Sequence, residues 1–445
     1  MLPSGARALL IAEAANPEWV SVPLVGWSLS RALVEATDAH VVTQVRNRDA
    51  LLRAGWTEGR EFTVLDSEPV ARPMWLFDAW LRRLTGLGWT TSQALSAFPY
   101  YYFEHLLWRR FGAAIERREF SVVHRITPLS PTIPSLVARR CRRAGVPFVW
   151  GPINGGIAWP PGFEGVIRAE GEWLSYLRGA HRLLPESRAT RSAASAIIVA
   201  SKATLSELGP YADKCVYIPE NAVDPARFPR PARAPAAGGP LRVVFIGRLV
   251  PYKGADILLE AAAPLVREGA VSVEIIGDGP QRPQLEALIA AQGLGAGTTL
   301  AGWIPNEKLA AHLAGADVLG FPSVREFGGG VVLEAMALGL VPVVVDYGGP
   351  GELVTERTGF RVPIGTRAEL VAAFRERLSR LASDRASIPA LSASARARVE
   401  AWFTWPAKAR QVLAVHRWVR GEGLKPDFGT PFPDASPTPQ PMARG

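Results

Sequence analysis

The feature of this 445-residue sequence that most constrains its fold is an alternation of short apolar runs with segments of helix length. Such runs are typical of buried strands in a parallel sheet, joined by crossover helices. In the first half of the chain the expected strands are Ala6–Ala12, Ala39–Thr43, Phe62–Leu65, Ser121–His124, Pro147–Trp150, Ser195–Ala200 and Cys215–Ile218.

The alternation stops and then starts again. Residues 224–240 carry five prolines and a Gly-Gly pair, a composition typical of a linker. Further strands are expected at Leu241–Ile246, Val271–Ile276, Thr298–Leu300, Val318–Phe321 and Val341–Val345, with helices near Asp256–Leu265 and Gln281–Ala291. The pattern predicts an α/β protein with two Rossmann-like domains facing a cleft, and ligands at the carboxyl ends of the strands.

The domain boundaries follow from the same pattern. We expect an N-terminal domain over 1–224, a linker over 225–240 and a C-terminal domain over 241–400. Residues 401–420 are expected to form a last helix that could return to the N-terminal domain. Residues 421–445 are rich in Pro and Gly without periodicity, which predicts a disordered tail.

Composition excludes several classes of protein. Hydrophobic residues make up 48% of the chain, so disorder throughout is excluded, and its two cysteines exclude a disulfide scaffold. No apolar run is long enough to span a membrane, and the run at 8–12 is too short for a signal peptide. We therefore expect a cytoplasmic protein. The net charge is +9, of which residues 1–235 contribute +7, and this basic half favours an anionic partner.

The strongest chemical signal follows the strand at 241–246. Gly247 and Gly254 allow sharp turns, and between them Arg248 and Lys253 place two cations close to the start of a helix. That arrangement suits a diphosphate. The alternative is a surface turn with two solvated cations.

A second signal follows the strand at 318–321. Gly328, Gly329 and Gly330 let backbone N–H groups approach a ligand closely. Glu326 lies in this loop, and Glu334 lies further on among apolar residues, where sugar hydroxyls are suitable donors to a carboxylate. The alternative is a helix face on which Glu334 simply reaches solvent.

Together the two segments resemble the retaining GT-B enzymes of glycosyltransferase family 4, also called glycosyltransferase group 1. Glu326 and Glu334 match the two-glutamate signature of that family, and residues 218–224, 277–280, 302–305 and 347–352 match further motifs. The resemblance implies transfer of a hexose from a nucleotide sugar to an acceptor hydroxyl, in polysaccharide, glycolipid or other glycoconjugate synthesis. The family's step is usually described as a front-face substitution. A nucleotide-sugar epimerase of the same fold is the alternative.

The resemblance also implies roles for individual residues. Arg248 and Lys253 would stabilise the departing diphosphate, and Glu326 would act on the donor sugar. Glu334 would hold the ribose, and Ile304 would lie against the base. The donor would also contact Gly247, Phe327, Gly328, Gly329, Gly330 and Val331. The sequence has no Asp-x-Asp and no metal-ligand spacing, so we expect neither a metal nor another cofactor.

In the first half, three places match the family less closely. Gly26 is the donor-contact candidate in the loop expected after the first strand. His124 matches a histidine that approaches the donor sugar, the alternative being a structural hydrogen bond. Asn154, Gly155 and Gly156 follow a strand and are assigned to the acceptor side.

Aromatic and basic residues alternate in two stretches, one with Phe77, Trp80, Leu81 and Leu84 and the other with Leu107, Trp108, Phe111 and Ile115. Such amphipathic helices can lie on an anionic membrane, so a peripheral position on the inner face of the cell membrane is one interpretation. The alternative is that these stripes face the core. A nucleic-acid-binding module that stacks bases on the aromatics is a further hypothesis from a different class. The two-glutamate motif favours the enzyme, because a nucleic-acid scaffold does not need it.

Overall fold

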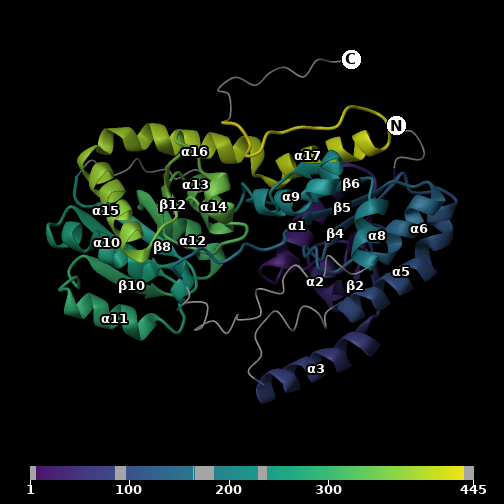
Figure 1. The fold of residues 1–445 in the computed structure, drawn as a ribbon, viewed down its shortest axis with the longest axis horizontal. Helices are drawn as coiled ribbons and strands as arrows, with labels where there is room; N and C mark the ends of the chain where they lie inside the picture. The colour runs from purple at the N-terminus through teal and green to yellow at the C-terminus, as the bar shows by residue number, and fades with distance from the viewer. Residues whose placement is uncertain (1–6, 86–96, 164, 166–184, 229–237, 435–445) are drawn as a thin grey trace. The chain divides into compact units, whose positions relative to one another are not determined.

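A computed structural model describes residues 7–85, 97–163, 165, 185–228 and 238–434. Contacts divide the chain into two units. Unit 1 takes its described residues from 1–158, 167–220 and 408–429, and unit 2 takes them from 159–166, 221–407 and 430–445. Each unit is an α/β sandwich with its own parallel sheet (Figure 1). The predicted α/β fold with two Rossmann-like domains is confirmed.

Unit 1 contains a seven-stranded sheet in the order β3-β2-β1-β4-β5-β6-β7. Its strands are β1 (Ala8–Ala12), β2 (Ala39–Gln44), β3 (Phe62–Leu65), β4 (Val122–Thr127), β5 (Phe148–Ile153), β6 (Ala196–Val199) and β7 (Cys215–Tyr217). All the pairings are parallel. The central strands are buried along their whole length, because helices cover both faces of the sheet. Because both faces of these strands are buried, their sequences are mainly apolar.

The main helices of unit 1 are α1 (Val22–Ala36), α2 (Arg48–Arg53), α3 (Glu68–Thr85), α5 (Ala97–Glu116), α6 (Leu136–Ala144), α8 (Pro185–Ala193) and α9 (Lys202–Glu207). Helix α6 buries Val137, Ala138 and Cys141 and ends at Gly145, whose φ of 69° provides the left-handed C-cap. On α5, Leu107 and Ile115 are fully buried. The aromatic stripe of α5 therefore faces the core. The side chains of the other stripe, from Phe77 onward, lie outside the described residues.

Unit 2 contains a six-stranded sheet in the order β10-β9-β8-β11-β12-β13. Its strands are β8 (Leu241–Ile246), β9 (Val271–Ile276), β10 (Thr298–Gly302), β11 (Val318–Phe321), β12 (Val341–Val345) and β13 (Phe360–Val362). Four of them have the bounds expected from the sequence. Strand β13 was not expected from the sequence; it is a three-residue strand at the sheet edge that carries Arg361 and is only partly buried.

The helices of unit 2 are α10 (Ala255–Arg267), α11 (Arg282–Ala291), α12 (Asn306–Leu313), α13 (Gly330–Leu338), α14 (Gly348–Leu353), α15 (Arg367–Ser383) and α16 (Ile388–Trp402). Helix α15 begins with a capping box in which Thr366 and Glu369 bond each other's backbone N–H groups. Of the linker expected over 225–240, residues 229–237 lie outside the described residues.

The C-terminal region differs from the sequence prediction in two ways. The expected helix over 401–420 is in fact α17 (Trp405–Val419), separated from α16 by Phe403 and Thr404. From Lys408 to Gly429 the chain groups with unit 1. Residues 421–434 are also described, and Phe432 is buried against the rings of Trp402 and Phe403. The prediction of a disordered tail is therefore wrong for residue 432 and its neighbours, and residues 435–445 lie outside the described part.

Among the described residues, no helix combines the length and the apolar character needed to cross a membrane.

Candidate functional site

The site in unit 2 is built on two loops that follow adjacent strands. Strands β8 and β11 pair directly, so their carboxyl ends lie side by side. The loop after β8 carries Gly247, Arg248 and Lys253, and the loop after β11 carries Glu326 and three glycines. Ligands of open parallel sheets bind at this edge.

Close backbone contacts hold the first loop in place. Leu249 N–H donates to the carbonyl of Asp278 at 2.9 Å, and Gly247 N–H donates to Ile276 at 3.0 Å. A Cβ on Gly277 would overlap the carbonyl oxygen of Gly247, and Gly277 has a φ of 138° that disfavours other residues. The Gly-Asp-Gly motif at 277–279 therefore has a packing role, since it lets the loop that follows β9 support the loop that follows β8.

The two site loops also bond to each other. The carbonyl of Tyr252 accepts hydrogen bonds from Val324 N–H at 3.0 Å and from the Ser323 hydroxyl at 3.3 Å. Gly254 takes a φ of 75°, and a Cβ there would lie 2.7 Å from the Pro322 carbonyl oxygen. The structure thus brings the two predicted motifs together, although about 80 residues separate them in the sequence.

The central interaction of the site is an ion pair between Lys253 and Glu326, with the Lys253 Nζ hydrogen-bonded to Glu326 Oε2. The side chains are 17% and 19% exposed, so the pair is shielded but still reaches solvent. The Lys253 Nζ also lies 5.7 Å from the centre of the Tyr252 ring and 5.5 Å from that of Phe321. An ammonium group has three N–H donors, so Lys253 keeps donor capacity for a ligand.

Two more features make this edge electropositive. Arg248 is exposed directly after β8. Helix α13 begins at Gly330, with Gly329 as a left-handed N-cap, and helix N-termini attract anions. Gly328 lies next to this N-cap, and Val331 is in the first turn of α13.

Glu334 lies in the second turn of α13 and is partly buried. Burial raises the pKa of Glu334 to about 7, while Arg227 opposes that shift. The carboxyl therefore changes charge near neutral pH. Ile304 lies in the loop after β10, two strands away from β8 in the sheet, and is also partly buried.

A third loop supports the second one. Gly349 N–H, at the start of α14, donates to the carbonyl of Glu326 at 3.1 Å, and a Cβ on Gly349 would overlap the carbonyl oxygen of Phe327. The Asn221 side chain lies against Gly330, where an added Cβ would meet it at 3.6 Å.

One cluster beside the site was not expected from the sequence. The Arg325 guanidinium lies 4.5 Å from the centre of the Trp159 ring and 5.5 Å from that of Phe327. Trp159 also meets the Tyr252 ring edge-on at 6.1 Å. Packing of the Arg325 guanidinium on Trp159 and Phe327 therefore holds both sequence neighbours of Glu326 in place. No motif marks Trp159, because it lies far from the loop in sequence.

His124 differs from its prediction. It does not close its strand, because β4 continues to Thr127, and it is fully buried. Its Nε2 lies 2.6 Å from the carbonyl oxygen of Gly151, and its Nδ1 lies 3.0 Å from His416 Nε2. Burial lowers the pKa of His124 to about 4 and that of His416 well below its usual value. Both ring nitrogens of His124 are engaged within unit 1, so the structure supports the structural alternative.

Gly26 also differs from its prediction, because it lies inside α1 and not in a loop. A Cβ there would overlap the carbonyl oxygen of Ala14. Close packing of α1 against the chain after β1 thus explains this glycine without a ligand.

Asn154, Gly155 and Gly156 do follow β5, at the carboxyl edge of the sheet of unit 1. Asn154 Nδ2 donates to Glu220 Oε1 at 2.9 Å, and Gly155 N–H donates to Thr204 Oγ1 at 2.8 Å. Gly156 N–H donates to the Asn154 side chain at 3.2 Å. These bonds shape the loop.

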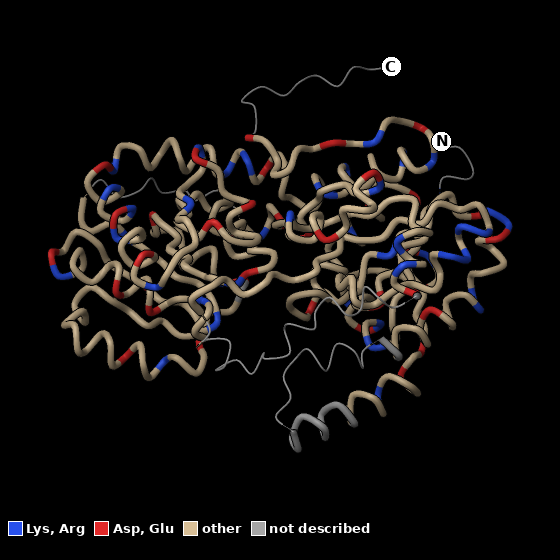
Figure 2. Tube along the Cα trace, viewed as in Figure 1, with Lys and Arg blue, Asp and Glu red and all other residues tan. Residues whose placement is uncertain are grey.

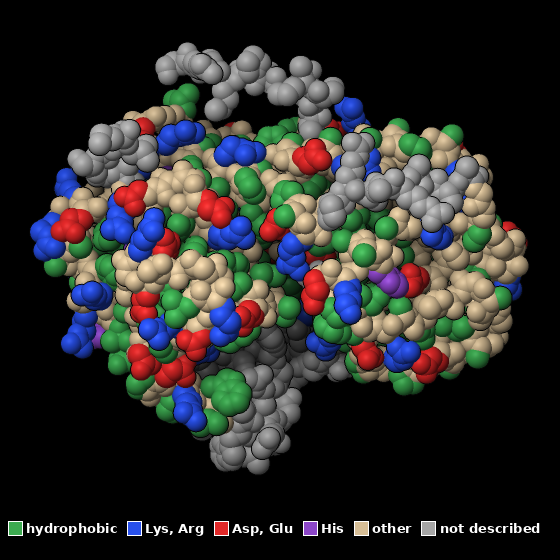
Figure 3. Space-filling view, turned by 180° about the vertical axis from the view of Figure 1, so that it is seen from behind, with side chains coloured by type: hydrophobic (Ala, Val, Ile, Leu, Met, Phe, Trp, Pro, Cys, Tyr) green, Lys and Arg blue, Asp and Glu red, His purple; other side chains and the backbone are tan. Residues whose placement is uncertain are grey.

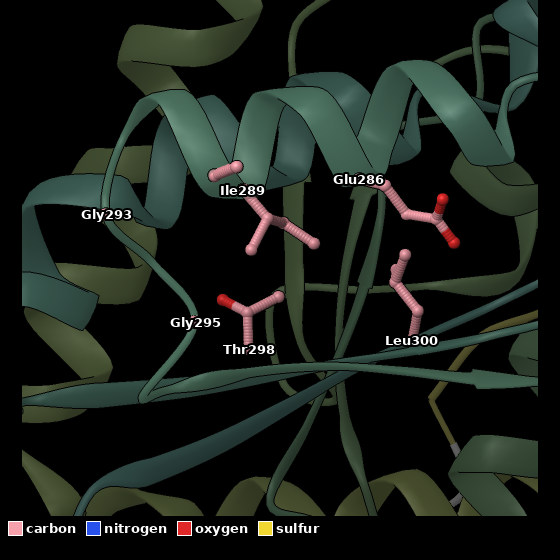
Figure 4. Close-up of a pocket in the computed structure, with 7 residues that line it drawn as sticks. Glu286, Ile289, Gly293, Gly295, Thr298 and Leu300 are labelled. Atoms are coloured by element: carbon pink, nitrogen blue, oxygen red, sulfur yellow. The ribbon is translucent and has the colours of Figure 1, made fainter.

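A hollow of about 610 Å³ lies between α11 and β10 (Figure 4). Ile289 on the helix and Leu300 on the strand point into it, and Glu286 and Thr298 are among its few polar groups. Thr298 is the first residue of β10, so this hollow includes the end of the strand opposite to the site. Within the described chain, no group of three or more His, Cys, Asp and Glu side chains is arranged to hold a metal ion.

Comparison with known proteins identifies what the chain resembles. Residues 240–381 match the family model described as glycosyl transferases group 1. A GDP-mannose-dependent alpha-mannosyltransferase of Mycobacterium tuberculosis is 30% identical over 310 residues, which are 67% of this chain and 73% of that protein. An alpha-D-kanosaminyltransferase of Streptomyces kanamyceticus is 34% identical over 33% of this chain. The chain spans only 40% of the length of that relative.

Solved structures share the fold. The structure of HepE from Anabaena in complex with UDP superposes with a TM-score of 0.59 at 17% identity, covering 92% of this chain and 98% of HepE. At this identity the likeness extends to the fold alone. The two parallel sheets are those of the GT-B fold.

Proposed function

The chain belongs to the group 1 glycosyl transferases, the family 4 enzymes that its motifs resemble, and on that premise we propose that it transfers a sugar from a nucleotide-sugar donor to an acceptor hydroxyl with retention of configuration. The donor diphosphate binds at the carboxyl edge of the sheet of unit 2. Polysaccharide or glycoconjugate synthesis is the setting in which such a transfer is used.

The observation that carries this proposal is the convergence of positive charge on one edge of the sheet. Lys253, Arg248 and the N-terminus of α13 all lie at the ends of the paired strands β8 and β11. In transfer, negative charge grows on the leaving diphosphate, and fixed cations that meet this charge lower the barrier. Glu326 holds the ammonium of Lys253 in place before the donor binds.

The remaining donor contacts follow from their positions. Glu326 and the backbone of Phe327 to Val331 face the sugar and phosphates. Glu334 accepts hydrogen bonds from the ribose hydroxyls, and Ile304 packs against the base. Sugar hydroxyls are suitable partners for a carboxyl that burial makes costly to ionise. Acceptor recognition is assigned to unit 1, where Asn154, Gly155 and Gly156 lie at the strand ends.

The test begins with the donor. UDP-glucose, GDP-mannose and other nucleotide sugars are screened by thermal shift, because a ligand that binds only the folded chain raises its Tm. A donor that raises Tm is then incubated with and without candidate acceptor sugars, and the products are followed by NMR. Transfer with retained anomeric configuration supports the proposal. Conversion of the donor without any acceptor supports the epimerase instead, and no shift with any nucleotide sugar contradicts both.

A further inference from the structure

The excess positive charge of unit 1 gathers on one row of helices. Helix α3 packs against α5, α5 against α6, and α6 against α8. Figure 2 shows Lys and Arg along α6 and the neighbouring parts of α5 and α8. We call the outward side of α5, α6, α8 and the turn after α5 the basic helical surface.

Eight arginines of the basic helical surface are exposed, and only three acidic residues accompany them there. The acidic residues are Glu116, Glu119 and the partly exposed Glu186. The exposed arginines are Arg109, Arg110, Arg117, Arg118, Arg139, Arg142, Arg143 and Arg188. Figure 3, seen from behind, shows blue side chains along the left-hand edge, where this unit lies. The local charge balance is far more one-sided than that of the whole chain.

Half of these eight arginines have no partner among the described residues, and Arg118 and Arg142 bond only the backbone carbonyls of Ala144 and Ser192. Arg117 pairs with Glu119 at 2.7 Å, and Arg139 approaches Glu186 only to 3.9 Å. Arg109, Arg110, Arg143 and Arg188 form no salt bridge with any described residue. Placing like charges together raises the free energy of the folded state through repulsion, and an anionic partner would offset this cost.

Helix α6 supplies three of the eight exposed arginines, through an amphipathic pattern. Its apolar residues turn inward, and Arg139, Arg142 and Arg143 lie together on the other side, at spacings of three and four. These three arginines line an open groove of about 610 Å³ between α6 and α8, together with Ala189, Ser192 and Ala193. The groove offers a charged recess to an anionic group.

The end of the same row carries exposed apolar side chains. On α3, Trp75 is 63% exposed and Leu76 is 55% exposed, and α3 packs directly on α5. Exposed apolar side chains on a helix that packs against the arginine-bearing α5 suit the interface of an anionic bilayer, where headgroups meet the cations and the indole ring enters the acyl boundary.

We propose that the basic helical surface, together with Trp75 and Leu76 on the adjoining helix α3, docks unit 1 on an anionic lipid bilayer, with lipid phosphates against the arginines of α6. The exposed tryptophan and leucine favour a membrane over a nucleic acid, because phosphate recognition alone does not require them. This surface is separate from the donor site of unit 2, and its test does not depend on catalytic activity.

The test is flotation of the purified chain with vesicles of equal parts phosphatidylglycerol and phosphatidylcholine, compared with phosphatidylcholine alone. Each arginine near an anionic surface strengthens partitioning about fivefold. The double variant Arg110→Gln/Arg143→Gln is therefore expected to bind anionic vesicles about 25-fold more weakly. The matched control Arg357→Gln/Arg380→Gln removes two exposed arginines of unit 2 and is expected to leave binding unchanged.

A second variant tests the apolar part. Trp75→Ser/Leu76→Ser is expected to reduce vesicle binding about tenfold, since it removes the side chains that would enter the interface. Circular dichroism and Tm confirm that each variant is folded. Equal binding to both vesicle types overturns the proposal, as does an equal loss in the unit 2 control. Retention of RNA or duplex DNA with no vesicle binding assigns the surface to nucleic acid instead and also overturns it.

Discussion

The replacement of Lys253 by methionine tests the donor site most directly. Methionine keeps an unbranched apolar chain between the rings of Tyr252 and Phe321 but removes the ammonium that bonds Glu326. Loss of one fixed donor to a developing anion costs roughly 10²–10³ in kcat, or about 2.7–4 kcal/mol. We therefore expect turnover of the donor to fall at least ~100-fold.

The structure also sets the stability cost of this change. The pair is only partly buried, with side chains 17% and 19% exposed, so Glu326 can still be hydrated after Lys253 is lost. We expect a loss of about 1 kcal/mol, which corresponds to a fall in Tm of roughly 2–4 °C for a domain of this size. If the rise in activation free energy calculated from kcat is far larger than the loss in free energy of unfolding, Lys253 acts on the substrate and not mainly in folding.

A double-mutant cycle measures the coupling between Lys253 and Glu326. If Glu326 acts mainly by orienting Lys253, Glu326→Gln in the Lys253→Met background should add little further loss, because the two residues act as one unit. Steady-state kinetics with the donor found in the thermal-shift screen give kcat and KM for the wild type, both single variants and the double variant. Turnover within threefold of wild type in Lys253→Met would refute the proposed diphosphate contact.

Other predictions follow from single contacts. Gly277→Ala should weaken nucleotide binding at least tenfold, measured by calorimetry, because its methyl group displaces the loop of Gly247; unchanged affinity contradicts the supporting role. Nucleotide affinity should rise from pH 6 to pH 8 as Glu334 ionises with a pKa of about 7, and Glu334→Gln should remove this rise; a flat wild-type profile counts against a ribose contact. The lowered pKa values of His124 and His416 mean that the unfolded chain binds more protons, so stability should be complete above pH 6.5 and be lost as the pH falls toward 4. His416→Gln, which can still donate to His124, should flatten that dependence of Tm; an equally steep profile contradicts it. EDTA should leave transfer intact, and a loss that manganese restores would contradict the expectation of a metal-free reaction.

Most strands of both sheets could be predicted from the sequence because burial on both faces makes central strands such as β1 and β12 continuous apolar runs. Site residues were easier to predict in unit 2 than in unit 1, since the loops of unit 2 carry glycines and charges in a recognisable order. The edge strand β13 lacked an apolar run, because Arg361 lies at its centre. In unit 1, Gly26 was assigned to a loop although Ser21 and Pro23 mark the start of α1; the Ser21 side chain forms no N-cap hydrogen bond there.

Contacts between residues distant in sequence could not be predicted in the same way. The bond from His416 to His124 spans 292 residues, and neither histidine lies in a motif that names the other. The packing of Trp159 on Arg325 likewise joins a segment that precedes the linker to the loop after β11. Such partners depend on tertiary structure, whereas the sequence reveals only what local spacing requires.

The glycines of the site divide into two groups with different consequences. Gly277, Gly254 and Gly349 are required by other backbone atoms, since an added Cβ would overlap or crowd a carbonyl oxygen in each case. At Gly330 an added Cβ would meet only the Asn221 side chain, at ordinary contact distance. The first group fixes where the cations and the start of α13 lie, while Gly330 leaves room at the surface that a donor would approach. Substitution in the first group should therefore lower stability and binding together, whereas Gly330→Ala should lower donor affinity with little change in Tm. Most glycines of these motifs are therefore required by backbone packing, and only a glycine such as Gly330 is explained by the approach of a ligand.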